Sequence, residues 1–255
     1  MKILILQNRM GIGDMIMFLP FIEAISKKFK TPVTILAKKN TKVEMYFNNK
    51  EIVEEIMYLE REDNKKHSGV KGFFKLVNEL KLKKFDKVFI FNSSLRYFLI
   101  SKFSGIKEVF HYPLFKKKNQ QIIKAAKEFT LKSIGEDIES TPRLFLKEQD
   151  ILKAKKDHSI DQSITNIILG IGGSGKTKRV PASIFKSFMS KVLKRSNCRF
   201  FLMTGNNVDE LKIMDEIIES EYKEYCTPLN NFTIKEILPI IPNCQIAICN
   251  DSSFS

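Results

Sequence analysis

The chain has 255 residues, of which 43% are hydrophobic and 28% charged, so it can bury a core and is not disordered by composition. Lys and Arg total 43 against 29 Asp and Glu, and the formal net charge of +14 favours an anionic partner. Residues 1–150 hold 29 basic and 18 acidic residues, so +11 of this charge belongs to the first part of the chain.

The first part of the chain alternates between β-rich apolar runs and amphipathic helical patterns. We expect strands at 2–6, 33–37, 55–59, 87–91 and 108–111, with helices at 15–29 and 70–82 among those between them. Residues 116–135 are basic and then helical, and the run Lys116-Lys117-Lys118 is expected to be a solvated loop. This alternation is typical of a parallel sheet covered by helices on both faces.

A second α/β series follows from about residue 166. Its expected strands are 166–170, 199–204, a short one near Tyr225, and 245–250; its expected helices are 181–194, 208–220 and 233–240. We therefore divide the chain into two domains, 1–150 and 151–255, with a linker within 135–160.

Several common features are not predicted. The apolar run that ends at Gln7 is too short for a secretory signal, and the stretch 15–22 contains Pro20 and is too short to span a bilayer. The cysteines Cys198, Cys226, Cys244 and Cys249 form no C-x-x-C and have no His at zinc spacing, so we expect buried free thiols rather than disulfides or a metal site. These observations favour a soluble, cytoplasmic protein.

The end of the chain is unusual. Residues 245–250 read as a buried strand, and DSSFS follows directly where a helix normally comes next. We expect a truncated protein or a fragment.

The segment from Gly170 to Thr177 fits the phosphate-binding expression G-x-x-x-x-G-K-[ST] at every fixed position, directly after an expected strand. In such a loop Lys176 and Thr177 would open a long helix, yet Pro181 would break it and fits better as the first residue of a separate helix. A P-loop nucleotide hydrolase or kinase stays open as an alternative function.

A glycine-rich turn also follows the first strand. Gly11 and Gly13 permit a tight turn and the close approach of a ligand. Asp14 is expected at the start of the next helix, where the helix dipole stabilises an anionic side chain. It is either an N-cap or a functional carboxylate.

Four modest motifs, taken in order, resemble glycosyltransferase family nine, the ADP-heptose:lipopolysaccharide heptosyltransferases. They are Gly11-Ile12-Gly13-Asp14 with Leu19-Pro20, Gly173-Ser174 with Lys178-Arg179-Val180-Pro181, the strand that ends in Thr204-Gly205, and Asn250-Asp251-Ser252. The chain departs from the family pattern at Val180, where Trp is usual, and at Ser253, where Gly is usual. It also ends before the family's His.

The resemblance implies an α/β, GT-B-like fold of two Rossmann-like parallel-sheet domains facing a cleft, the second incomplete. Domain 1–150 would take the acceptor and domain 151–255 the nucleotide-sugar. The implied reaction is an inverting, metal-independent transfer of a sugar, heptose by family default, from a nucleotide-diphosphate sugar to a bacterial lipopolysaccharide core or similar glycolipid. It implies no cofactor, with ADP-heptose as the default donor substrate.

The resemblance also assigns residue roles. Asp14 would be the general base, because direct displacement needs one beside the acceptor hydroxyl, and Gly11 and Gly13 would form the acceptor-side loop. The implied donor-side residues are Gly173, Ser174, Lys178, Asp251, Ser252 and Ser253, with Lys178 on phosphate and Asp251 on sugar hydroxyls.

The implied partners are a nucleotide-sugar and an anionic glycolipid at the cytoplasmic face of the inner membrane, where the contact with the bilayer would be peripheral. Nucleic acid is not expected, because neither interleaved aromatic residues nor a helix-turn-helix pattern is evident. A non-catalytic, truncated remnant is a further alternative.

Overall fold

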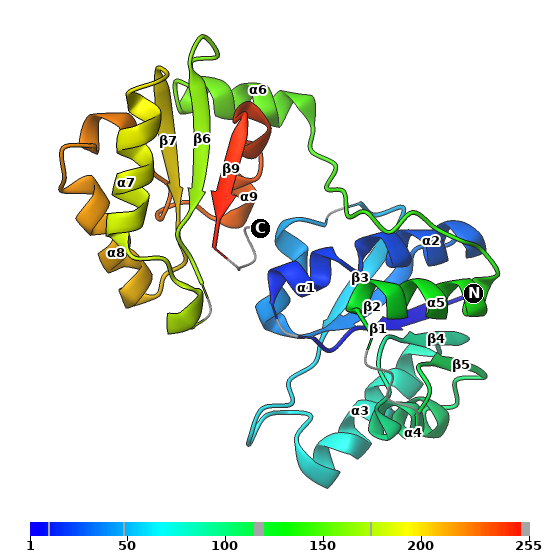
Figure 1. Ribbon diagram of the computed structural model, residues 1–255. Coiled ribbons are helices and arrows are strands. Elements are labelled where there is room, and N and C mark those ends of the chain that lie inside the picture. The colour runs from blue at the N-terminus through cyan, green and yellow to red at the C-terminus, as the bar shows by residue number, and fades with distance from the viewer. Residues whose placement is uncertain (10, 48, 115–119, 174, 251–255) are drawn as a thin grey trace. The chain divides into compact units, whose positions relative to one another are not determined.

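The structure is a computed structural model that describes residues 1–9, 11–47, 49–114, 120–173 and 175–250 (Figure 1). The chain divides into two compact units, Met1–Leu144 and Phe145–Ser255. The predicted boundary after residue 150 falls inside helix α6 (Glu148–Asp157), which the structure assigns whole to the second unit. The reason is packing, since Ala154 of α6 lies in the same apolar cluster as Phe201 and Ile237.

The first unit is built on a parallel sheet with strand order β3-β2-β1-β4-β5. The strands are β1 (Ile3–Leu6), β2 (Val33–Ala37), β3 (Val53–Tyr58), β4 (Lys87–Ile90) and β5 (Glu108–His111). Every residue of β1 and β2 is buried, as in strands covered on both faces. This sheet confirms the parallel α/β fold expected for the first part of the chain.

Helices cover both faces of this sheet (Figure 1). They are α1 (Ile12–Ile16), α2 (Leu19–Phe29), α3 (Gly69–Lys83), α4 (Leu95–Phe103) and α5 (Ile122–Ile134), with short 3-10 turns at Lys39–Thr41 and Val43–Met45. α3 packs against α4 on one face, and α2 against α5 on the other. The run Lys116-Lys117-Lys118 lies outside the described residues.

The predicted single helix over 15–29 is wrong, because the structure has two helices there. α1 ends at Ile16, and Pro20 lies in the first turn of α2. Proline has no backbone N–H and its ring collides with the carbonyl four residues earlier, here that of Ile16, so it disfavours a continuous helix at this point.

The second unit has a parallel sheet of order β8-β7-β6-β9. The strands are β6 (Thr165–Gly170), β7 (Cys198–Met203), β8 (Cys226–Pro228) and β9 (Ile246–Cys249). Helices α7 (Ala182–Leu193) and α8 (Val208–Ile218) cover one face, while α6 and α9 (Ile234–Ile237) cover the other (Figure 1). Short 3-10 turns occupy Lys176–Lys178, Lys223–Tyr225 and Ile241–Asn243.

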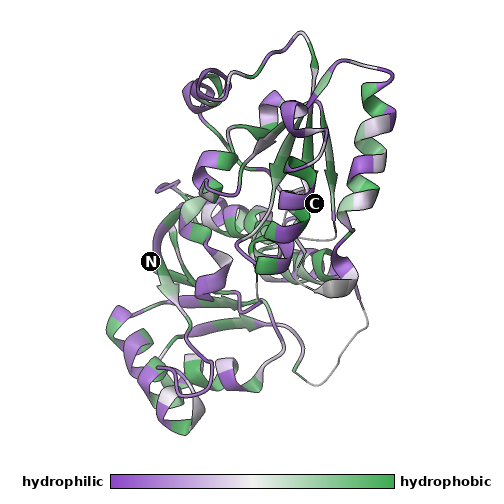
Figure 2. Ribbon diagram, turned by 90° about the vertical axis from the view of Figure 1, so that its left-hand side faces the viewer, coloured by the Kyte–Doolittle hydropathy of each residue, from purple (hydrophilic) through white to green (hydrophobic). Residues whose placement is uncertain are grey.

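Most of the strand residues are hydrophobic and the helices are mixed, as Figure 2 shows. β9 was expected to be buried, but Ile246 and Ile248 are exposed, because β9 pairs with β6 on one side and has no neighbour on the other among the described strands. Among the described residues, no helix is both long and apolar enough to cross a bilayer.

The four cysteines are free, but only Cys198 is fully buried. Cys226, Cys244 and Cys249 are half-buried, so the prediction of buried thiols is confirmed for Cys198 alone. Burial raises the pKa of Cys226 and of Cys244 to about 12, which keeps both thiols protonated at neutral pH.

Candidate functional site

Each sheet changes its winding direction beside its first strand, and the candidate site residues gather there. In the first unit β1 lies between β2 and β4, and in the second unit β6 lies between β7 and β9. In open α/β sheets, ligands bind beyond the carboxyl ends of the strands at such points. The turn after β1 carries Asp14, and the turn after β6 carries Gly173 and Lys178.

The turn after β1 presents Asp14 at the start of α1, as predicted. The N-cap is Gly11, with φ 102°, and Asp14 lies in the first helical turn rather than at the cap. Its side chain is about 25% exposed, and its carboxylate lies 3.8 Å from the guanidinium of Arg9. The alternative that Asp14 is merely an N-cap is therefore wrong, and its carboxylate is accessible to a ligand.

Polar side chains link the turns after β1 and β4. Asn92 donates from Nδ2 to Oδ1 of Asn8 at 3.1 Å, and its own Oδ1 accepts the N–H of Ser94 at 2.9 Å. Gln7 is fully buried and accepts the N–H of Arg9 at 2.8 Å. These bonds fix the segment that carries Asp14.

Two buried polar atoms near these turns have no hydrogen-bond partner within the described part of the chain: Nε2 of Gln7 and the hydroxyl oxygen of Tyr112. Tyr112 directly follows β5, and burial raises the pKa of its hydroxyl although the charge of Arg9 acts in the opposite direction. Unpartnered buried groups are uncommon and often mark a functional site.

The turn after β6 is held by a buried carboxylate from α8. Glu210 accepts the N–H of Gly173 at 3.0 Å through Oε1 and the N–H of Gly205 at 2.8 Å through Oε2. Nε of Arg179 donates to the carbonyl of Gly173 at 3.0 Å and lies 3.9 Å from Glu210, while Nη1 lies 2.6 Å from Asp209. The same network thus fixes the ends of β6 and β7.

Gly173 allows the chain to double back on itself here. A Cβ atom at this position would lie 2.9 Å from the carbonyl oxygen of Lys178, closer than real Cβ contacts. The 3-10 turn ends at Lys178, whose backbone N–H donates to the carbonyl of Gly175 at 2.9 Å. Gly173 and the exposed Lys178 are therefore neighbours, as their predicted shared role requires.

The end of β9 is tied to the same turn through Asn250. Its backbone N–H bonds the carbonyl of Gly170 at 3.0 Å, and its side-chain Nδ2 bonds that of Ile171 at 2.7 Å. The predicted site residues Asp251, Ser252 and Ser253 follow Asn250 directly but lie outside the described residues, as does Ser174.

The structure contradicts the P-loop alternative. Residues Lys176–Lys178 form a 3-10 turn, and helix α7 begins only at Ala182, with Pro181 as its N-cap rather than its first residue. A P-loop binds phosphate at the N-terminus of the helix that its Lys-Thr pair opens, and no such helix starts here.

Sequence reasoning missed Glu210 and the Asn8–Asn92 pair. The pattern Asn207-Val208-Asp209-Glu210 resembles a capping box, in which Glu210 would bond back to the backbone N–H of its own N-cap. Asn207 does cap α8 through the N–H of Asp209, but Glu210 reaches across to the turn after β6.

Within the described residues, no cluster of three or more His, Cys, Asp or Glu side chains could hold a metal ion.

Comparison with known proteins gives one family. The model of glycosyltransferase family 9 (heptosyltransferase) matches residues 73–255. A search of curated proteins finds no significant match.

Several solved structures share the fold. Escherichia coli ADP-heptose lipopolysaccharide heptosyltransferase II has a TM-score of 0.71 at 17% identity, covering 99% of this chain and 80% of that one. A family 9 glycosyltransferase from Veillonella parvula has a TM-score of 0.71 at 18% identity, covering 99% and 76%. E. coli heptosyltransferase WaaC with ADP has a TM-score of 0.69 at 13% identity, covering 100% and 83%. At these identities the likeness establishes the α/β, GT-B-like fold alone.

Proposed function

The chain belongs to glycosyltransferase family 9, and we propose that it transfers a sugar from a nucleotide-diphosphate sugar to a bacterial envelope glycolipid, with inversion and without a metal. Heptose is the proposed sugar and ADP-heptose the proposed donor. The acceptor is the lipopolysaccharide core or a similar glycolipid. The observation that carries this proposal is the accessible carboxylate of Asp14 at the winding-reversal point of the first sheet.

In the proposed reaction Asp14 is the general base. The acceptor hydroxyl attacks the anomeric carbon from the face opposite the leaving nucleoside diphosphate, and its proton passes to the Asp14 carboxylate. The bond to the diphosphate breaks as the new glycosidic bond forms, so the anomeric configuration inverts. A positioned base of this kind contributes roughly 10²- to 10⁴-fold to the rate.

The second unit supplies the proposed donor side. Lys178 neutralises charge on the leaving diphosphate, and the turn from Gly173 through Ser174 lies near its phosphates. Asp251 holds sugar hydroxyls, while Ser252 and Ser253 contact phosphate. In support, one solved WaaC structure contains ADP and another ADP-2-deoxy-2-fluoro heptose.

The proposed acceptor is anionic, because most of the net charge lies in the first part of the chain. The enzyme would act in the cytoplasm and contact the cytoplasmic face of the inner membrane peripherally.

Steady-state transfer and donor hydrolysis test this function. Asp14→Asn should lower kcat by roughly 10²-fold or more with little change in donor KM, because it removes the base and keeps the shape. Lys178→Ala should lower kcat/KM for the donor by roughly 10²-fold. The exposed residues Asp63 and Lys191 provide the matched controls Asp63→Asn and Lys191→Ala, which should behave as wild type.

Three results would count against the proposal. Transfer by Asp14→Asn at the wild-type rate would remove Asp14 as the base. Loss of activity on adding a chelator would contradict a metal-independent reaction. Donor binding without turnover would support the non-catalytic remnant instead.

A further inference from the structure

The outer side of α3 and α4 exposes a group of large apolar side chains. Val70, Phe74 and Phe103 are 73%, 57% and 63% exposed. The ring of Phe73 connects the other two phenylalanines, with ring centroids 5.2 Å from Phe74 and 6.0 Å from Phe103. We call Val70, Phe74 and Phe103 the α3–α4 patch. Its aromatic part is contiguous and anchored, because Phe73 packs against the buried core.

Lysines surround this patch. Apart from Gly69 at its start, the exposed residues of α3 fall within about 140° of arc at 100° per residue. They are Val70, Lys71, Phe74, Lys75, Asn78, Lys81 and Leu82. Lys102 precedes Phe103 on α4 and is also exposed. Glu79, the one acidic residue of these two helices, is engaged with Lys66 at 2.8 Å and His67 at 3.1 Å.

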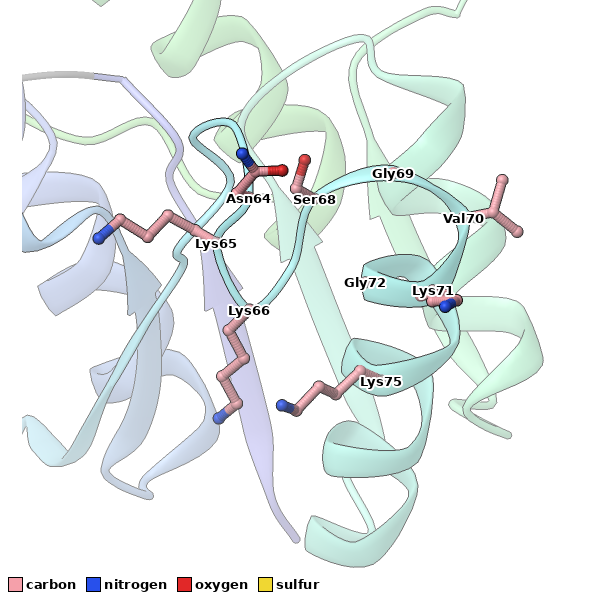
Figure 3. Close-up of a pocket in the computed structure, with 9 residues that line it drawn as sticks. All are labelled: Asn64, Lys65, Lys66, Ser68, Gly69, Val70, Lys71, Gly72 and Lys75. Atoms are coloured by element: carbon pink, nitrogen blue, oxygen red, sulfur yellow. The ribbon is translucent and has the colours of Figure 1, made fainter.

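A basic pocket of about 510 Å³ adjoins the patch where α3 begins. Its lining includes Lys65, Lys66, Ser68, Lys71 and Lys75, and holds no carboxylate. Figure 3 shows the side chains of Lys66 and Lys75 directed toward one another, while Val70 points away from the loop. Val70, Lys71 and Lys75 belong to both the pocket lining and the exposed side of α3, so the two features form one surface.

The loop that forms this pocket is held by hydrogen bonds to a buried histidine and from α4. The ring of His67 is buried, with Nδ1 accepting the N–H of Glu60 at 3.1 Å and Nε2 bonded to Glu79 at 3.1 Å. Arg96 of α4 donates to the carbonyls of His67 at 3.0 Å and Gly69 at 2.8 Å. The lysines are therefore presented from a fixed backbone.

We propose that the α3–α4 patch and its lysines dock on the surface of an anionic lipid bilayer. Apolar and aromatic side chains flanked by lysines suit the boundary between acyl chains and headgroups. The lysines and the pocket are complementary in charge to lipid phosphates, and this favours a membrane over a second copy of this equally basic chain. The inference deepens the proposed function. It rests on that function, because it assumes that the acceptor is a membrane glycolipid.

Co-sedimentation of the full chain with vesicles tests this surface. The wild type should bind vesicles of phosphatidylglycerol and phosphatidylcholine in equal parts, and bind pure phosphatidylcholine far more weakly. Lys71→Glu with Lys75→Glu should weaken binding about thirtyfold or more, since each lysine near an anionic surface contributes about fivefold. The double variant Phe74→Ser with Phe103→Ser should also weaken binding to these vesicles, although its net charge equals that of the wild type.

Two control proteins separate this surface from general charge and hydrophobicity. Lys124→Glu with Lys132→Glu makes the same charge change on α5, which covers the opposite face of the sheet. Phe145→Ser removes a ring that is 78% exposed in the second unit. Both should bind vesicles within about threefold of wild type, a spread of less than 1 kcal/mol.

Equal binding by the patch variants and the control variants would overturn the inference, as would equal binding of wild type to both vesicle types. Self-association of the wild type that Phe74→Ser abolishes, without vesicle binding, would overturn it in favour of a contact between copies. Donor hydrolysis, measured without vesicles, should be unchanged in the patch variants. A failure of docking and a failure of the transferase function are thus distinguishable.

Discussion

Removing the buried carboxylate of Glu210 should loosen the turn after β6. In Glu210→Ala the N–H groups of Gly173 and Gly205 lose their acceptor, while Arg179 keeps its contact with Asp209. A buried N–H left without a partner costs about 1–3 kcal/mol, and the half-buried Gly205 is partly compensated by water. We therefore expect the local opening free energy to fall by about 2–4 kcal/mol.

Amide hydrogen exchange of the full chain measures this loss directly. The amides of Gly173 and Gly205 should exchange roughly thirty- to several-hundred-fold faster in Glu210→Ala. The donor KM should rise as well, because the turn after β6, which we propose lies near the donor phosphates, is less ordered. Glu216→Ala, on the exposed side of the same helix, is the matched control and should leave both amides unchanged. If the Gly173 and Gly205 amides exchange less than about threefold faster in Glu210→Ala than in the wild type, or no faster than in Glu216→Ala, the proposed role of Glu210 is refuted.

Three further predictions concern the first unit. Gly72→Ala should lower the thermal stability of the chain by about 1–3 kcal/mol, because its Cβ would lie 2.1 Å from the carbonyl carbon of His67; an unchanged melting temperature would contradict this packing. Gly11→Ala should cost about 1–3 kcal/mol through its backbone conformation alone, because φ 102° with ψ 160° is a region that essentially only glycine adopts and nothing lies within 4 Å of the added Cβ; urea unfolding measures this cost. Burial acts to raise the pKa of Glu79, but hydrogen bonds from Lys66 and His67 outweigh it and hold that pKa below its ordinary 4.5. The ionised form therefore stabilises the fold above about pH 4.5, and this contribution is lost as the pH falls through the lowered pKa. Glu79→Gln should accordingly lower the urea midpoint more at neutral pH than in acid, and an equal loss at both would contradict the ion pair.

Local patterns predicted most of the strands. The strands at 33–37 and 108–111 have their predicted bounds, because short β-rich runs between polar segments leave little ambiguity. Helix α4 was not among the predicted helices, since its apolar residues follow no helical periodicity. It forms because Tyr97 and Ile100 reach the core formed with α3.

Site residues were predictable only where a single segment of the chain determines their position. Asp14 lies at the start of a helix, as the pattern after the first strand indicated. Glu210 could not be assigned, because its partners Gly173 and Gly205 are brought to it by the pairing of β6 with β7. The roles of Ser174, Asp251, Ser252 and Ser253 stay predictions.

Incubation of the wild-type chain with ADP-heptose and a lipopolysaccharide-core acceptor tests the proposed function most directly. Mass spectrometry of the acceptor and NMR of the new anomeric centre identify the product. The proposed function predicts release of ADP, an acceptor heavier by one heptose, and an anomeric configuration opposite to that of the donor. A product with retained configuration, or an acceptor left unmodified while the donor is bound, would contradict it.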